Sequence, residues 1–362
     1  MKRRTGLIGA ALGLTAAAAG AALVADRKIG ATRRIGQERV HDFDPPAADR
    51  VGTLQTSDGV ALYYEENGPH DAAVTVIAIH GFCLNREDFL FQRRAVIEAY
   101  GTQARFIAYD HRSHGRSGRS SAENATIDQL GRDLHTVVTE LAPTGKVVLI
   151  GHSMGGMTIM ALADAHPELF EAGGRISGVI LLDTSTGKLA ELTFGLPAAF
   201  ARTNVVMPTV IRGMKRQRTV VEKGRAQAGD VFWVFLQRVG FARPADPALV
   251  EFTAQIIAST PVDVIADFYP ALMSHDKLAA LGVLRDSRVA IVCGEYDLIT
   301  PPAHSRAMAE ALPNAELVMI PNAGHQALME QPELVNAVLL RFVDAALAEA
   351  SRRRRRRKTS TG

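Results

Sequence analysis

The chain has few of the residues on which cross-linked or metal-dependent proteins rely. Its 362 residues include two cysteines, Cys83 and Cys293, which lie far apart and each follow or end an apolar run. That placement favours buried free thiols over a disulfide. Histidine, cysteine and aspartate form no cluster at the spacing of metal ligands, so we expect no metal and no other cofactor.

Aromatic residues are also scarce, which bears on the arginine-rich C-terminus. They make up 6% of the chain, and Trp233 is the single tryptophan. Residues 352–358 are six arginines and a lysine with no aromatic residue among them. Because no nucleic-acid fold motif accompanies this charge, we expect no nucleic-acid partner. We expect residues 351–362 to form a disordered basic tail, of a composition that also suits anionic lipid headgroups.

Charge is missing from residues 5–25, which are almost wholly alanine, glycine, leucine, isoleucine and valine. Three basic residues precede the stretch, which is the layout of an export signal or a membrane anchor. No clean A-x-A cleavage site accompanies it, so an uncleaved anchor is favoured over a removed signal peptide. A soluble alanine-rich helix is the other alternative, but it would show a polar face. We therefore expect membrane association through residues 5–25 and a location in the cell envelope or outside the cytoplasm.

Strand and helix patterns alternate along the body of the chain. A turn at residues 57–59 divides an alternating segment, which predicts an antiparallel hairpin at a sheet edge. Further buried strands are expected at residues 74–79, 106–109, 147–150, 176–182, 289–292 and 317–320, with helices at 127–141, 301–312 and 332–349. This alternation predicts an α/β fold with a mostly parallel, eight-stranded sheet and helices on both faces.

One interval interrupts this alternation. Residues 186–278 show helical patterning, prolines and no convincing buried strand, and a loop of that length without structure is uncommon. We expect a helical cap there, whose apolar runs at Trp233 and Ile256 either line a pocket for an apolar substrate or pack the cap onto the body. The predicted order is an anchor at 1–25, a linker at 26–50, core segments at 51–185 and 279–350 around the cap, and the tail at 351–362.

A glycine-rich corner joins one predicted strand to a helix. The sequence Gly151-His152-Ser153-Met154-Gly155-Gly156 follows the apolar strand at 147–150 and precedes a buried helical segment. In a G-x-S-x-G elbow the glycines are needed because side chains there would collide with the tight backbone, which pushes the serine into a cleft. The helix N-terminus also favours developing negative charge. Ser153 is therefore the candidate nucleophile, and a glycine-rich packing turn is the alternative.

A serine hydroxyl needs a base, and the base needs an acid that orients it. His325 follows the last predicted strand in a loop of small residues, and Asp297 follows the strand at 289–292. The order Ser153, Asp297, His325 is the one expected for a nucleophile elbow on such a sheet. These three residues are the predicted catalytic set.

Other residues compete for parts of this site. Glu295 and Asp183 remain alternative acids, because each lies just beyond a predicted strand end. His152 precedes the nucleophile but points away from it on the turn, so we expect it to be packed or hydrogen-bonded.

Two backbone N–H groups are expected to stabilise the oxyanion of a tetrahedral intermediate. Met154 supplies one because it follows the nucleophile, and Phe82 is the candidate for the other because it follows His80-Gly81 at the end of the first buried strand. Gly81 lets the backbone turn inward. His80 is expected to brace the loop and not to move protons.

Taken together, these motifs resemble those of the α/β-hydrolase fold superfamily over roughly residues 51–348. The similarity lies in His80-Gly81-Phe82, Asp110-His111-Arg112-Ser113-His114-Gly115-Arg116-Ser117, the elbow, Gly294-x-x-Asp297 and Gly324-His325. The elbow is similar to those of monoacylglycerol-lipase-like esterases and cofactor-free haloperoxidase-like enzymes. Members with an aspartate nucleophile, the haloalkane dehalogenases and epoxide hydrolases, are disfavoured because Ser153 occupies that position.

The resemblance and the triad favour a serine hydrolase that cleaves carboxylic esters through an acyl-enzyme. Apolar or lipid-like esters, with acyl glycerols among them, are the expected substrates. Carbon–carbon bond hydrolases and cofactor-free perhydrolases share these motifs and remain alternatives. A catalytically silent binding protein is a third possibility, against which the intact triad argues. Neither the acyl-chain length nor the oligomeric state follows from the sequence.

Overall fold

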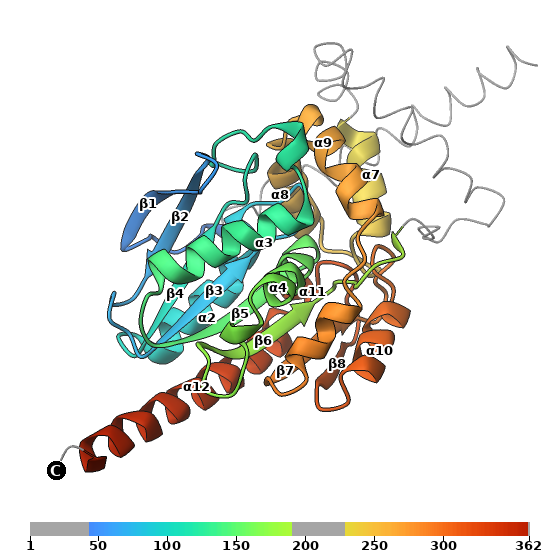
Figure 1. Cartoon of the computed structure of the whole chain (residues 1–362). Helices are drawn as coiled ribbons and strands as arrows, with labels where there is room; N and C mark the ends of the chain where they lie inside the picture. The colour runs from blue at the N-terminus through green and yellow to red at the C-terminus, as the bar shows by residue number, and fades with distance from the viewer. Residues whose placement is uncertain (1–42, 190–228, 361–362) are drawn as a thin grey trace, which may run out of the picture.

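Eight strands form one sheet in the computed structural model, which describes residues 43–189 and 229–360 (Figure 1). The strands are β1 (Arg50–Gln55), β2 (Ala61–Asn67), β3 (Val74–Ile79), β4 (Ala104–Tyr109), β5 (Lys146–His152), β6 (Ile176–Leu182), β7 (Val289–Gly294) and β8 (Glu316–Ile320). They lie in the order β1-β2-β4-β3-β5-β6-β7-β8. The β1–β2 hairpin joins β4 antiparallel, and all later neighbours are parallel. The expected eight-stranded, mostly parallel sheet is confirmed.

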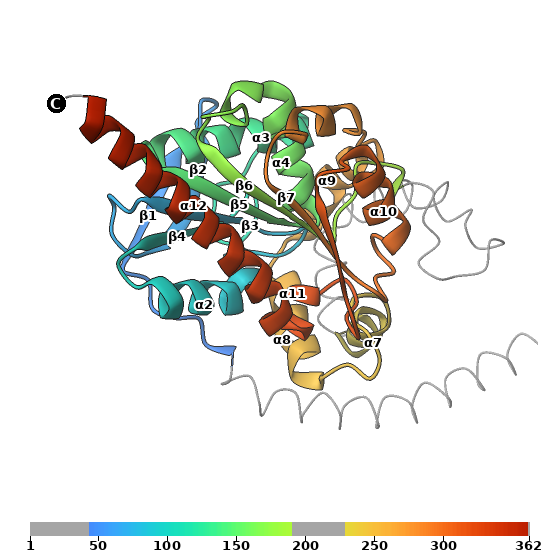
Figure 2. The same ribbon diagram turned by 90° about the horizontal axis from the view of Figure 1, so that it is seen from below.

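Helices cover both faces of this sheet (Figures 1 and 2). The helices of the body are α2 (Leu90–Tyr100), α3 (Ile127–Thr136), α4 (Met154–Ala165), α10 (Pro302–Ala311), α11 (Ala327–Glu330) and α12 (Pro332–Ser360). Along β3, Val76 and Ala78 join the apolar core beneath α2, α11 and α12, whereas Ile77 and Ile79 join the core beneath α3, α4 and α10. The period of two therefore divides each central strand between two cores.

Three helices occupy the described part of the interval assigned to a cap. They are α7 (Gly229–Val239), α8 (Pro247–Ala258) and α9 (Val262–Met273). Trp233 is 1% exposed and packs against Leu236 and Val250, so it belongs to a core within the cap itself. Ile256 packs instead against the core beneath α2 and α12. Both apolar runs thus hold the cap together or to the body.

The C-terminal end of the chain differs from our expectation of a disordered tail. Helix α12 continues to Ser360, and Figure 1 shows its last turns projecting beyond the sheet. Because arginine is a good helix former and the helix is already nucleated on the body, extending it through the basic run costs little.

Our prediction of a membrane segment at residues 5–25 lies outside the described residues. Within residues 43–189 and 229–360, no single helix is long and apolar enough to cross a bilayer. Helices α8 and α9 pass that test only as a pair bent by 96°.

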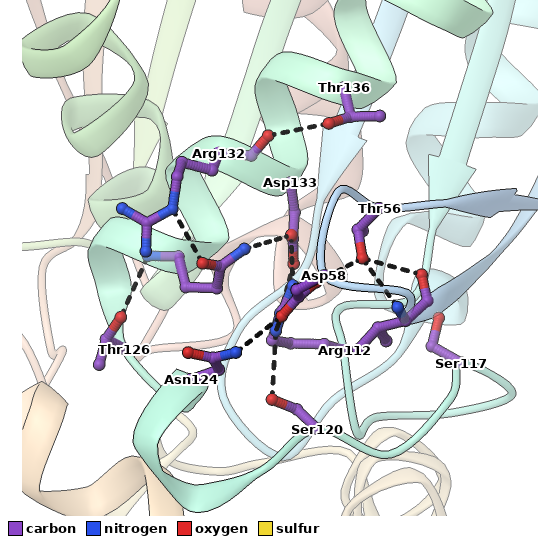
Figure 3. A network of polar contacts seen from close by, with 12 residues as sticks. Thr56, Asp58, Arg112, Ser117, Ser120, Asn124, Thr126, Arg132, Asp133 and Thr136 are labelled. Carbon is purple, nitrogen blue, oxygen red and sulfur yellow. Dashed lines mark hydrogen bonds and ion pairs between the residues drawn. The ribbon is translucent and has the colours of Figure 1, made fainter.

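A buried arginine ties the loop after β4 to two other elements (Figure 3). The guanidinium of Arg112 is fully buried and donates to both carboxylate oxygens of Asp133 in α3, each at 2.6 Å. It also donates to Asp58 in the β1–β2 turn at 2.7 and 2.9 Å. Burial alone would lower the pKa of Arg112, but the two carboxylates raise it, so the guanidinium stays charged. The network fixes α3, which packs on α4.

The crossing of α3 and α4 leaves no room for a side chain at Gly131. A Cβ there would lie 2.8 Å from the Cβ of Ala161 in α4. Overpacking of this kind costs about 1–3 kcal/mol, while alanine gains about 1 kcal/mol over glycine in helix propensity. We expect Gly131→Ala to lower the free energy of unfolding by roughly 1 kcal/mol in urea denaturation. Gly282→Ala, where nothing lies within 4 Å, is the matched control; equal effects of the two substitutions would contradict the prediction.

Candidate active site

Ser153 lies at a strained corner between β5 and α4. Its backbone has φ 51° and ψ −115°, a left-handed conformation that costs a non-glycine residue about 1–3 kcal/mol. The flanking glycines allow it: a Cβ at Gly151 would press on the backbone of Gly155, and a Cβ at Gly155 would overlap the carbonyl oxygen of Ile79. The glycines of the elbow are therefore needed for the steric reason inferred from the sequence.

His325 and Asp297 form a direct hydrogen bond at the same edge of the sheet. Since a carboxylate can only accept, the Nδ1–H of His325 donates to Asp297 Oδ2, over 2.9 Å. This leaves His325 Nε2 as the free lone pair of the ring, with no hydrogen-bond partner in the described parts of the chain. The ring centroid of His325 lies 5.0 Å from that of His152, the residue before Ser153. Asp297 and His325 are thus in direct contact, and the residue before Ser153 lies beside them.

The alternative acids take other positions. Glu295 is exposed, and Asp183 accepts from the backbone N–H groups of Gly294 (2.7 Å) and Ala327 (3.3 Å) instead of from His325. Asp297 is the carboxylate that contacts the imidazole. Asp183 thus links Gly294, at the end of β7, to Ala327, which lies two residues after His325.

The two buried aspartates differ in charge. Burial would raise the pKa of Asp297, but His325 and Thr300, whose hydroxyl and N–H both donate to it, lower the pKa below its usual range. The pKa of Asp183 is raised well above its usual value, first by burial and then by the charge of Asp297. Asp297 is therefore ionised at neutral pH, whereas burial and the charge of Asp297 favour the protonated form of Asp183.

The loop after β3 lies against the nucleophile. A Cβ on Gly81 would be 3.3 Å from the Cβ of Ser153, so only glycine lets this backbone pass so close. Among the described residues, the backbone N–H groups of Phe82 and Met154 are not donors in the backbone hydrogen bonds of turns, loops and helix ends. His80 donates from Nδ1 to Gly81 O and accepts from the His111 N–H, and burial lowers its pKa to about 4. His80 braces the loop as a neutral ring, as expected.

The backbone around His325 is held by four different partners. The N–H of Gly324 donates to Glu330 (2.7 Å), and that of Gln326 donates to Gly240 O in the cap (3.1 Å). Asp183 accepts from Ala327, and His152 Nε2 lies 2.8 Å from the carbonyl oxygen of His325. Sequence reasoning did not identify Glu330, because no motif or period marks a carboxylate that binds only backbone N–H groups.

The cap contacts both loops of the site. The hydroxyl of Thr260, between α8 and α9, donates to Cys83 O, one residue after Phe82. The other carboxylate oxygen of Glu330 accepts from Ala242 N–H in the cap (2.8 Å). The cap is thus fastened at the oxyanion loop and at the base loop.

An apolar wall lies between α9 and the elbow. Phe268 is 1% exposed and packs in one cluster with Met154, Met157 and Leu272, and the half-buried ring of Phe82 lies against that cluster. These side chains come from the cap, the elbow helix and the oxyanion loop.

Asp183, Cys293 and Asp297 offer oxygen or sulfur atoms within 4.8 Å of one another, a spacing that could hold a metal ion. The oxygens of both aspartates already accept hydrogen bonds from N–H or hydroxyl groups, and burial raises the pKa of the Cys293 thiol. Thiolate and carboxylate forms bind metals, so a neutral thiol and a neutral acid fit a hydrogen-bonded cluster better. Cys83 and Cys293 are both free and buried, which confirms that expectation.

The fold and this geometry define an α/β protein with a nucleophile elbow. Residues 74–332 match the family model described as the alpha/beta hydrolase fold. The chain belongs to this family, which supports a hydrolase activity.

Individual relatives are distant but extend over most of the chain. It is 27% identical to a non-heme chloroperoxidase of Streptomyces lividans, over 81% of this chain and 99% of that protein. It is 28% identical to a proline iminopeptidase of Neisseria meningitidis, over 80% and 93%. A thermophilic esterase from Thermogutta terrifontis superposes with a TM-score of 0.62 at 25% identity, over 82% and 99%.

Glu330 gives the site a pH-dependent element. Burial raises its pKa from 4.5 to about 7, although the Gly324 and Ala242 N–H groups oppose the shift. The folded state therefore holds this proton where the unfolded state has lost it, and stability falls as pH rises from 4.5 to 7. We expect Glu330→Gln to remove this slope, so that the variant gains roughly 3 kcal/mol on the wild type between pH 4.5 and pH 8.

Urea denaturation of both proteins at several pH values measures this difference. Glu295→Gln, at an exposed carboxylate of the same edge, is the matched control for loss of a charge. Parallel stability curves for the wild type and Glu330→Gln would show the prediction to be wrong.

Proposed function

We propose that this protein is a serine hydrolase that cleaves carboxylic esters of apolar or lipid-like substrates through an acyl-enzyme. The observation that carries the proposal is the His325–Asp297 hydrogen bond of 2.9 Å, made next to His152, the residue that precedes Ser153. The strained φ of 51° at Ser153 is that of a nucleophile elbow. Burying an ionised aspartate against an imidazole costs desolvation energy. Such costly arrangements are concentrated at functional sites, where the aspartate orients a catalytic base.

Each residue has a chemical role in this proposal. His325 Nε2 takes the proton of Ser153 as the oxygen attacks the ester carbonyl, and it returns that proton to the departing alcohol. Asp297 holds the Nδ1–H tautomer and stabilises the imidazolium that forms. The N–H groups of Phe82 and Met154 donate to the oxyanion. A water activated by His325 then attacks the acyl-enzyme and frees Ser153. We expect the hydrogen bond between Ser153 and His325 Nε2 to form when substrate binds.

The apolar wall supports the substrate class. Phe82 and Met154, whose N–H groups are assigned to the oxyanion, carry side chains in or against the cluster with Phe268. We expect an acyl group attached to Ser153 to contact the half-buried ring of Phe82, which borders this cluster. Burying each CH₂ there would contribute about 0.8 kcal/mol. The similarity to the esterase from Thermogutta terrifontis is consistent with this substrate class. The similarity to the chloroperoxidase makes a perhydrolase reaction the main alternative.

Removal of the nucleophile tests the proposal directly. We expect a fluorophosphonate probe to label the wild type at Ser153 and not Ser153→Ala, and p-nitrophenyl ester turnover to fall by at least about 10³-fold. Asp297→Asn, which leaves the ring in the wrong tautomer, should lower kcat by about 10³- to 10⁴-fold. Asp183→Asn is the matched comparison, because Asp183 is a buried aspartate at the same sheet edge that does not contact the imidazole. It should lower kcat less than Asp297→Asn does.

A substrate panel separates ester hydrolysis from its competitors. Turnover of esters that rises with acyl-chain length supports the proposal. Turnover of a diketone or perhydrolysis with peroxide, without ester cleavage, would overturn the ester class while keeping the triad. Equal labelling of wild type and Ser153→Ala would overturn the triad, and retained partner binding without any labelling would favour a silent binding protein.

We also propose that residues 5–25 direct the chain to the membrane or across it. The proposal rests on an uncharged, apolar stretch of bilayer-spanning length after three basic residues. Fractionation of cells that express the full chain should place the protein in the membrane or envelope fraction, and a chain starting at residue 26 should lose that location. The full-length Ser153→Ala protein is the control. An unchanged distribution after truncation would contradict the proposal.

A further inference from the structure

A second histidine–carboxylate pair lies beside the one that contains His325. His152 and Asp88 are both 0% exposed, and His152 Nδ1 lies 2.7 Å from Asp88 Oδ2. Asp88 belongs to a short 3₁₀ helix, Arg86–Phe89, which precedes α2. Its other oxygen, Oδ1, is buried without a hydrogen-bond partner in the described part of the chain. The side chain of Asp88 is thus committed to His152.

The partners of His152 determine its protonation. Nε2 lies 2.8 Å from the carbonyl oxygen of His325, and a carbonyl can only accept. The carboxylate of Asp88 on the opposite nitrogen also only accepts when it is ionised. With an ionised Asp88, both ring nitrogens donate, and the ring that precedes Ser153 in the chain carries a positive charge. Burial alone would lower the pKa of His152, but the charge of Asp88 raises it above its usual value.

Other ionisable groups surround the pair. His80 lies in the loop after β3. Because burial lowers its pKa to about 4, it is neutral at pH 7 and does not repel a charged His152. Asp297 and the ring of His325 lie on the side of Nε2. The charge of Asp297 adds to that of Asp88 in favouring the protonated form of His152.

The second pair acts on the backbone of the first. The ring of His325 donates a hydrogen bond to Asp297, and the main-chain carbonyl oxygen of His325 accepts one from His152 Nε2. An imidazole pinned at one nitrogen alone can still swing about that bond. A second fixed point at the carbonyl oxygen holds the main chain from which that ring extends.

We propose that His152, charged and paired with Asp88, is a positioning residue that holds the main chain of His325 so that its ring faces Ser153. This inference rests on the proposed function. Neither His152 nor Asp88 takes part in the chemical steps; both act by positioning His325.

The charge of His152 is measured first, by nuclear magnetic resonance of protein labelled with ¹⁵N-histidine. Two nitrogens with the shifts of a protonated ring at pH 7, absent in His152→Gln, are the expected result. In Asp88→Asn the ring of residue 152 should become neutral. A singly protonated His152 in the wild type would overturn the proposal, because the proton would then reside on Asp88.

Kinetics measure the positioning role. His152→Leu should lower kcat for a p-nitrophenyl ester by about 10- to 100-fold, with KM changed by less than about threefold. His152→Gln should recover part of that loss, because its amide N–H₂ can donate to the carbonyl of His325. Equal kcat in folded Leu and Gln variants, or wild-type kcat in the Leu variant, would overturn the proposal.

The pH profile supplies a readout that a purely structural role would not move. Asp88→Asn should remove the positive charge of His152, whose Nε2 lies 2.8 Å from the carbonyl oxygen of His325. The acid limb of kcat/KM should shift to higher pH by up to about one unit. Asp133→Asn, which neutralises a buried carboxylate paired with Arg112, is the matched control and should leave that limb in place. An unmoved limb in Asp88→Asn would count against the charged pair.

Failure of the proposed function has a different outcome. A wild-type protein that neither cleaves esters nor reacts at Ser153 would overturn that function and the positioning role with it. The resonance measurement would still report whether His152 is charged by Asp88.

Discussion

The close approach of the elbow helix to β3 is the constraint on which the site depends. Gly155 packs directly on the carbonyl of Ile79, and no side chain fits between them. That contact forces Ser153 into its left-handed conformation and directs the first turn of α4 toward the loop after β3. The nucleophile, the Met154 N–H and the Phe82 loop are therefore positioned by one steric event, and the strain of the serine is offset by the packing of α4 between β5 and α3.

Several carboxyl groups of similar chemistry take different protonation states around His325. Asp297 faces the imidazole and a hydroxyl, so its charge is favoured despite burial. Burial and the charge of Asp297 raise the pKa of Asp183 well above its usual value, although two backbone N–H groups oppose the shift. Glu330 lies between, with a pKa of about 7. The two that do not contact the ring hold the backbone around His325, and their raised pKa values reduce the negative charge buried around the imidazole.

The cap is coupled to the chemistry through main-chain contacts. Thr260 binds the loop of Phe82, while Gly240 and Ala242 bind the loop of His325 through Gln326 and Glu330. Gly324 is a glycine because the cap backbone at Phe241 passes within 2.7 Å of where its Cβ would lie. Motion of the cap would move the oxyanion loop and the base loop together. In the proposed function, these hydrogen bonds would couple the position of the cap to the alignment of the reacting groups.

Local patterns in the sequence determined the strands, the edge hairpin, the elbow and the order Ser153, Asp297, His325, because periodicity and glycine sterics act over a few residues. The preference for Asp297 over Asp183 or Glu295 also began there, but only the folded chain shows which carboxylate reaches the imidazole. Tertiary structure alone revealed the Asp88–His152 pair and the backbone anchor of Glu330, and it extended α12 to Ser360. These features join residues from separate elements through buried polar contacts. Such contacts leave no periodic trace in the chain, since their energy depends on burial and geometry that exist only after folding.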